Sequence, residues 1–390
     1  MSRTIITDAK IYLEDEVMDQ AYLVIEDGKI KSFGQGSYEH ISSTDTVIDG
    51  KGKKVIPGFI DSHIHGAHSA DVMDGTEEAL ETMAKILPAE GTTSFLATTM
   101  TQSDENIEQA LETVASYDNK IGQAEILGVH LEGPFVNYNK KGAQPGQYIT
   151  PPNLDTFNRW QAIAKGLIKT ITVAPECDLH KGMFVKALNE QGVNVSAGHT
   201  AANYEQVKQA VEDGVHQLTH LCNAMEGIHH RDIGAVGAFM MIPQLKGELI
   251  ADFIHSSKEM VQLLFNSAQS DKIILITDSM RAKWLPPGEY ELGGQAVNVS
   301  EDRATLVEGD SLAGSILKMI DGVKNMLSLD GVTIRDIITM ASVNPAKQIN
   351  VFDRKGSIAE GKDADLLLVD DHMNIHYTLC NGVISYKEEK

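Results

Sequence analysis

The amino-acid sequence predicts an α/β protein, a (β/α)₈ TIM-like barrel with a small β-sandwich domain built from both chain termini. Apolar, strand-like runs alternate with amphipathic helical windows after Pro57-Gly58, which is typical of βα units around a parallel sheet. Eight such runs follow one another, and this number favours a closed barrel over an open, doubly wound sheet. Both ends of the chain have instead the short strands and turns of a β domain.

Short strands are expected near the start of the chain, where apolar residues alternate or cluster at 4–7, 11–13, 21–26 and 29–33. Asp27-Gly28 separates the last two runs and is a strong signal for a hairpin turn. The tail has the same character. Residues 364–369 form a buried-strand run, and Asn381-Gly382 makes a turn before 383–386.

The eight barrel strands are predicted at residues 55–64, 92–98, 126–131, 170–174, 193–198, 215–220, 248–254 and 272–277. Two intervening windows have clear helical periodicity. In the first, Thr76 is the expected N-cap of a helix with apolar positions at Leu80, Met83, Ala84 and Leu87. In the second, Gly214 is expected to end a helix with apolar positions at Tyr204, Val207 and Val211.

Residues 286–309 interrupt this rhythm with Pro-Pro-Gly, Gly-Gly and β-rich pieces, and predict a hairpin-like insertion after the eighth strand. We therefore expect a β domain from residues 1–54 and 346–390, and a barrel domain from residues 55–345. No Walker or G-x-G-x-x-G motif follows the first strand, which counts against a nucleotide-binding fold.

Composition and charge exclude several classes of protein. The 390 residues carry a net charge of −22, with 55 acidic against 33 basic side chains, so neither nucleic acid nor an acidic membrane is expected as a partner. No uncharged apolar run approaches the roughly 18 residues that a membrane helix needs, and the start of the chain has no signal-peptide pattern. Cys177, Cys222 and Cys380 are widely spread and odd in number, which indicates a reducing interior, and we expect a cytoplasmic protein.

The strongest local signal is His63-Ile64-His65 at the end of the first barrel strand. Residues i and i+2 of a strand point the same way, so the two imidazoles share one face and can grip one metal ion at the mouth of a barrel. By itself this pattern favours two hydrogen-bonded histidines near a loop. However, four other strand ends also finish in metal-ligand or acid/base residues: His130 with Glu132, His199, His220, and Asp278. Five such strand ends together indicate a functional site.

Seven sequence blocks spread over nearly the whole chain carry a family resemblance: PGFIDSHIHG (57–66), HLEGPF (130–135), SAGHT (196–200), THLCNAM (219–225), TDSM (277–280), LAGS (312–315) and NPA (344–346). On these blocks the chain resembles the amidohydrolase superfamily, and within it the N-acetylglucosamine-6-phosphate deacetylases. The tail block GSIAEGKDAD (356–365) is general to the superfamily. The LEGPF and NAM blocks are specific to the deacetylases. The resemblance implies a homodimeric enzyme that forms glucosamine 6-phosphate and acetate, in amino-sugar catabolism and cell-wall recycling.

The resemblance also implies the metal ligands. Glu132, His199 and His220 match the ligands of the main divalent ion, and His63 and His65 make a second ion plausible. Many superfamily members bridge two metals with a lysine from the fourth strand. Here that strand ends in Ala174-Pro175-Glu176, so Glu132 is the expected bridging group. Ligand nitrogen and oxygen atoms suit zinc, iron or manganese alike.

A metal ion lowers the pKa of bound water from about 16 to about 7, which supplies hydroxide at neutral pH. Asp278 is the expected base, which takes the proton of the water and returns it to the departing amine nitrogen. A role of Asp278 as a metal ligand or as an anchor for other ligands stays open, and the roles are compatible.

Substrate contacts are likewise implied by the resemblance, at Ala143, Gln144, Asn223, Ala224, Arg231, His255, Leu312, Ala313 and Gly314. Arg231 offers a planar fork suited to phosphate and is placed to reach a neighbouring subunit's site, with a surface ion pair as the alternative. Gln144 stands where some family members have histidine. Glutamine can hydrogen-bond the substrate but cannot titrate, so any carbonyl-polarising role of that histidine passes to the metals or is weaker.

Two other functions compete with this interpretation. An amidohydrolase acting on a cyclic amide or an N-acyl amino acid would share the fold and the metal, but the NAM block and Arg231 count against it. A non-catalytic sugar-binding or scaffold barrel would be expected to have lost Asp278 or a metal ligand, and none is lost.

Overall fold

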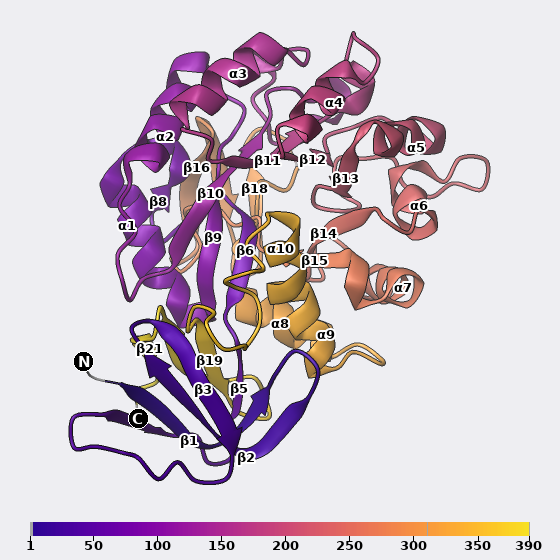
Figure 1. The fold of residues 1–390 in the computed structure, drawn as a ribbon. Helices are drawn as coiled ribbons and strands as arrows, with labels where there is room; N and C mark the ends of the chain where they lie inside the picture. Colours follow the sequence, from indigo (N-terminus) through magenta and orange to yellow (C-terminus); the bar gives the residue numbers. More distant parts are fainter. Residues whose placement is uncertain (1–2, 310, 390) are drawn as a thin grey trace.

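The structure, a computed structural model, describes residues 3–309 and 311–389 (Figure 1). Eight parallel strands follow one another in chain order around a nearly closed barrel, which confirms the predicted (β/α)₈ fold. The strands are β6 (Phe59–Ile64), β9 (Thr92–Thr98), β10 (Glu125–Glu132), β11 (Ile168–Val173), β12 (Asn194–Ala197), β13 (Val215–Leu218), β14 (Lys246–Ile250) and β15 (Ile273–Ile276). Nearly every residue in them is buried, as expected for strands covered on both faces.

The last barrel strand returns to the first through hydrogen bonds at the mouth of the barrel. The backbone N–H of Asp278 donates to the carbonyl of His63 at 2.8 Å. The carboxylate of Asp61 on β6 accepts from the backbone N–H and the hydroxyl of Thr277. These contacts bring the ends of β6 and β15, which lie more than 200 residues apart in the chain, into one site.

Helices surround the barrel strands (Figure 1). Both predicted helices are confirmed: Thr76 caps α1 by accepting from the N–H of Ala79 at 3.3 Å, and Gly214 follows the last residue of α5. The apolar face of α1 is buried against the sheet, as its periodicity predicted. The α-helices are α1 (Glu77–Ile86), α2 (Asp104–Ser116), α3 (Leu154–Ile163), α4 (Met183–Glu190), α5 (Tyr204–Asp213), α6 (Gly234–Met241), α7 (Lys258–Ala268), α8 (Met319–Leu327), α9 (Ile334–Ile338) and α10 (Asn344–Gln348).

Strands from both ends of the chain form a separate eight-stranded sheet (Figure 1). The turn at Asp27-Gly28 joins β2 to β3, as predicted. Strand β5 pairs with β1 on one side and with β19 on the other, so it joins the two ends of the chain. The strands are β1 (Thr4–Tyr12), β2 (Val17–Glu26), β3 (Lys29–Gln35), β4 (Thr46–Asp49), β5 (Lys54–Pro57), β19 (Leu366–Val369), β20 (Ile375–Cys380) and β21 (Val383–Lys387).

The prediction of one strand over residues 55–64 was wrong, because the run divides at Gly58 between the terminal sheet and the barrel. A Cβ at Gly58 would lie 2.2 Å from the hydroxyl oxygen of Thr93, so only glycine allows this close approach. Both pieces are buried and apolar, and the pattern of hydrophobic residues therefore contains no break. The division of the chain into domains of residues 1–54 with 346–390, and 55–345, stays a prediction.

The insertion after the eighth strand forms a three-stranded antiparallel sheet of β16 (Gly288–Leu292), β17 (Gln295–Val299) and β18 (Ala304–Leu306). Its apolar face packs on Met100, Ala143 and Met280, at the mouth of the barrel. A two-stranded ribbon of β7 (Gly66–Ala67) and β8 (Ala70–Asp71) follows the first barrel strand. Among the described residues, no helix has the length and apolar character needed to cross a membrane.

Candidate active site

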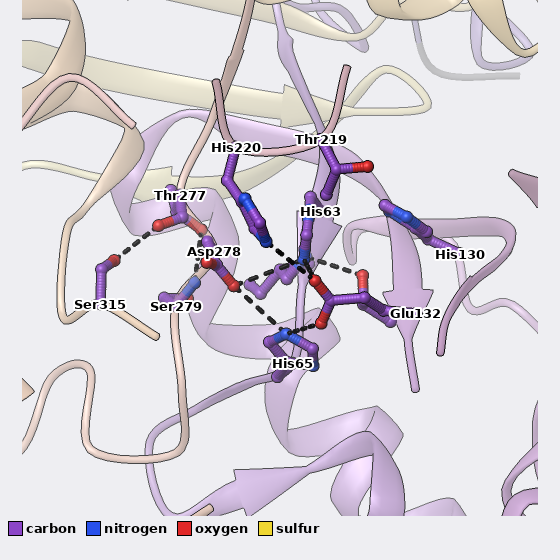
Figure 2. Close-up of polar contacts among 12 residues, drawn as sticks. His63, His65, His130, Glu132, Thr219, His220, Thr277, Asp278, Ser279 and Ser315 are labelled. Atoms are coloured by element: carbon purple, nitrogen blue, oxygen red, sulfur yellow. Dashed lines mark hydrogen bonds and ion pairs between the residues drawn. The ribbon is translucent and has the colours of Figure 1, made fainter. Parts of the chain in front are cut away.

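The polar residues predicted at the strand ends meet at one end of the barrel. Figure 2 shows the side chains of His63, His65, Glu132, His220 and Asp278 pointing toward one another. These residues and His199 are at most 8% exposed. The backbones of His199, His220 and Asp278 have φ angles of +45°, +32° and +48°, which non-glycine residues adopt at a cost and which cluster at functional sites.

Glu132, His199 and His220 form the first group of possible metal ligands. The Oε1 atom of Glu132 lies 3.2 Å from the Nε2 atom of each histidine, and the two Nε2 atoms lie 3.0 Å apart. The Nδ1 atoms of His199 and His220 contact the carbonyl oxygens of Lys140 and Asn223, at 2.8 and 3.1 Å. Because a carbonyl only accepts, each Nδ1 carries a proton, and in the neutral imidazole each Nε2 therefore presents its lone pair to the centre.

His63, His65 and Asp278 form the second group. The Nε2 atoms of His63 and His65 lie 3.4 and 3.2 Å from Oδ1 of Asp278. The carboxylate of Glu132 lies between the groups, since its Oε2 atom is 3.3 Å from Nε2 of His65. One oxygen of Glu132 therefore faces each group, and its bridging of two ions stays a prediction.

His63 provides a direct test of whether these residues fit a metal ion. Its Nδ1 atom lies 2.8 Å from Oε2 of Glu248, so the proton is held there. Its Nε2 atom is buried and has no hydrogen-bond partner among the described residues. A buried ring nitrogen that makes no hydrogen bond is costly, and a divalent ion bound between the two groups would take Nε2 as a ligand. The arrangement can hold a divalent ion.

The electrostatics of the site also favour a bound cation. Burial lowers the pKa of His65, but hydrogen bonds to Asp278 and Glu132 outweigh burial and raise it to about 10. Burial raises the pKa of Glu132, but the charge of His63 and the contacts of His199 and His220 lower it well below its usual range. The buried carboxylates are therefore stabilised by nearby positive charge. In the metal-free protein protons on the histidines provide this charge, and a bound divalent ion would replace those protons.

A cavity of about 360 Å³ opens above the two groups. Seven of the predicted substrate-contacting residues line it: Ala143, Gln144, Asn223, Ala224, His255, Leu312 and Gly314. Ala313 is fully buried beside the cavity, against the inserted sheet. Arg231 does not line the cavity: it is exposed on a loop, where its Nη1 atom contacts Nε2 of His230 at 2.7 Å. The structure therefore does not bring Arg231 to the site of its own chain.

Several residues of the site were missed from the sequence. Lys140 lines the cavity, and its Nζ atom lies 2.7 Å from Oε1 of Glu226. Glu248 fixes His63 from inside β14, and a charged residue within an apolar strand was the available signal. Glu176, just after β11, contacts two neighbouring loops. Its carboxylate accepts from Asn137 at 2.9 Å and from Thr200 at 2.6 Å, which ties together the loops after β10 and β12.

Comparison with known proteins adds an independent result. The amidohydrolase family profile matches residues 54–385. The chain is 44% identical to an N-acetylglucosamine-6-phosphate deacetylase of Lysinibacillus sphaericus, over 95% of this chain and 94% of that protein. It is 43% identical to the deacetylase of the same name from Bacillus subtilis (strain 168), over 98% and 97% of the two chains. The crystal structure of the N-acetylglucosamine-6-phosphate deacetylase of Thermotoga maritima superposes with a TM-score of 0.87 and 32% identity. The match covers 98% of this chain and 100% of that one.

Proposed function

Because this chain belongs to the amidohydrolase family, we propose that it is a metal-dependent hydrolase that deacetylates N-acetyl-D-glucosamine 6-phosphate. The products are D-glucosamine 6-phosphate and acetate, in amino-sugar catabolism and cell-wall recycling. The observation that carries this proposal is the carboxylate of Glu132 between two histidine groups, at the base of a cavity large enough for a sugar. Two deacetylases more than 40% identical over almost the whole chain support the substrate.

The chain's own residues supply the metal ligands and orient them. Glu132, His199 and His220 would hold the main ion, and His63, His65 and Asp278 would hold a second one. Nitrogen and oxygen ligands suit zinc, iron or manganese. A divalent ion bound there supplies polarisation of the amide carbonyl and lowers the pKa of a water molecule toward neutrality.

Asp278 is the proposed base. Burial raises its pKa, but the charge of His63 and the hydrogen bond with His65 outweigh burial and lower the pKa to about 2, so the carboxylate is ionised. It accepts a proton from the attacking water as the water oxygen bonds to the acetyl carbon. It then donates that proton to the sugar nitrogen as the carbon–nitrogen bond breaks, which releases acetate and the free amine.

The proposed phosphate subsite consists of four residues that line the cavity: Lys140, Asn223, Ala224 and His255. The Nδ1 atom of His255 lies 2.6 Å from Oδ2 of Asp252. Nitrogen atoms of these residues are the proposed donors to the phosphate. Such local donors can bind a phosphate in spite of the net charge of −22.

We further propose a cytoplasmic homodimer in which the exposed Arg231 reaches the cavity of the partner subunit. Its guanidinium would add a bidentate donor to the phosphate subsite. Three cysteines without disulfide partners are compatible with a reducing compartment.

The test is acetate release by the metal-loaded protein from four sugars: N-acetylglucosamine with and without the 6-phosphate, and N-acetylgalactosamine with and without it. We expect the highest kcat/KM with N-acetylglucosamine 6-phosphate, and a large loss when the phosphate is removed. Absence of acetate release from both phosphorylated sugars, with bound metal confirmed by elemental analysis, would overturn the proposal and leave only the family assignment.

A further inference from the structure

Gln144 is buried at the wall of the cavity, with 2% of its surface exposed, and its carboxamide has two specific partners. The backbone N–H of Thr101 donates to Oε1 at 2.9 Å. The Nε2 atom then donates to Oε2 of Glu132 at 2.7 Å. A backbone N–H can only donate, so the oxygen of the carboxamide must face Thr101 and the NH₂ group must face Glu132. The orientation of the amide is therefore determined by its surroundings.

The loop that carries Gln144 is held from several sides. The backbone N–H of Gln144 donates to the carbonyl of Lys141 at 2.8 Å. Gln295 of the inserted sheet donates from its side chain to the carbonyl of the preceding residue, Ala143. Thr101 follows closely after barrel strand β9. A side chain fixed at both its backbone and its amide can hold a partner in place at little further entropic cost.

The two carboxylate oxygens of Glu132 face different groups of metal-ligand candidates, so the orientation of the carboxylate has to be fixed. Its Oε1 atom lies 3.2 Å from Nε2 of His199 and of His220, whereas its Oε2 atom lies 3.3 Å from Nε2 of His65. When Nε2 lone pairs of the histidines bind a metal ion, those atoms donate nothing to the carboxylate. The NH₂ group of Gln144 is the donor that faces Oε2 of Glu132, at 2.7 Å.

We propose that Gln144 is a positioning residue that holds the carboxylate of Glu132 in its bridging orientation and so strengthens divalent metal binding. This inference rests on the proposed metal site. It differs from the substrate contact that the family resemblance implies, because the effect precedes substrate binding. Loss of hydrogen bonds to a metal ligand typically lowers metal affinity about 10- to 100-fold.

The test is a titration of the chelator-stripped, full-length protein with Co²⁺ alone, followed by its visible absorption. In Gln144→Met the amide is lost with little change in side-chain length. We expect the Kd for Co²⁺ to rise about 10- to 100-fold and the absorption bands to change in intensity. Gln161→Met is the control: the carboxamide of Gln161 likewise accepts one hydrogen bond and donates another, both with the backbone of Ile168, at 3.0 and 3.1 Å. Ile168 begins β11, at the opposite end of the barrel from the strand ends that carry the metal-ligand candidates. Its Co²⁺ affinity should equal that of the wild type.

An unchanged Kd and spectrum in Gln144→Met would overturn the inference, and so would an effect confined to KM or kcat for the sugar. The titration needs no substrate, so it is decisive even if the wild type releases no acetate. If circular dichroism shows that Gln144→Met does not fold, Gln144→Ala carries the same expectation, because the residue borders a cavity.

Discussion

Replacement of Asp278 by asparagine tests the proposed chemistry most directly. The substitution keeps the shape of a side chain that is 8% exposed, but an amide cannot accept the proton of the attacking water. Positioned general bases contribute about 10²- to 10⁴-fold to rate, which corresponds to about 2.7–5.4 kcal/mol at roughly 1.36 kcal/mol per factor of ten. We therefore expect kcat for N-acetylglucosamine 6-phosphate to fall about 10²- to 10⁴-fold, with little change in KM.

The structure separates this effect from loss of the metal. Asp278 contacts His63 and His65, whereas the first ligand group consists of Glu132, His199 and His220. Asp278→Asn should thus retain one ion per chain by elemental analysis. Initial rates of acetate release, compared with Asp330→Asn on the exposed surface, measure the loss. A decrease in kcat of less than about tenfold, or a decrease that added metal ion reverses, would refute the role of Asp278 as the base.

Three further predictions concern stability. Lys283 and Glu90 form a fully buried ion pair at 2.7 Å. Lys283→Met leaves the charge of Glu90 buried without its partner, so the free energy of unfolding from urea titrations should fall by about 3–5 kcal/mol. A decrease as small as that of an exposed lysine variant would contradict this. Burial raises the pKa of Glu125, but the hydrogen bond from Arg354 outweighs it and lowers the pKa below the usual 4.5. The stabilisation from Glu125 is therefore present above pH 4.5 and is lost as the pH falls through the lowered pKa, so Glu125→Gln should flatten the decrease in Tm below pH 4.5. Finally, a chelator should lower the Tm, and Zn²⁺ or Mn²⁺ should restore it. An ion present at 100 times its Kd adds about 2.7 kcal/mol to the free energy of unfolding. An unchanged Tm would count against a resident metal.

The barrel and most of its metal-ligand candidates could be predicted from the sequence for local reasons. The two-residue period of a strand places His63 and His65 on one face. Parallel strands of a barrel have their carboxyl ends at the same mouth, so Glu132, His199 and Asp278 converge without any knowledge of distances. The inserted hairpin was predicted from its turn residues, which act within a few positions of the chain.

Features that depend on contacts between distant segments could not be predicted. The division at Gly58 depends on the close approach of Thr93, and the exclusion of Arg231 from the cavity depends on the path of a surface loop. The contact of Gln144 with Glu132 requires Thr101, just after β9, to fix the amide.

The sequence by itself thus determined the fold class, the two-histidine motif and the set of strand ends that carry chemistry, because periodicity and strand direction are local properties. Only the tertiary structure decided which nitrogen of each histidine faces the centre and which side chain holds the carboxylate of Glu132. These properties depend on hydrogen bonds whose partners lie far apart in the chain, such as His63 with Glu248 and His199 with Lys140.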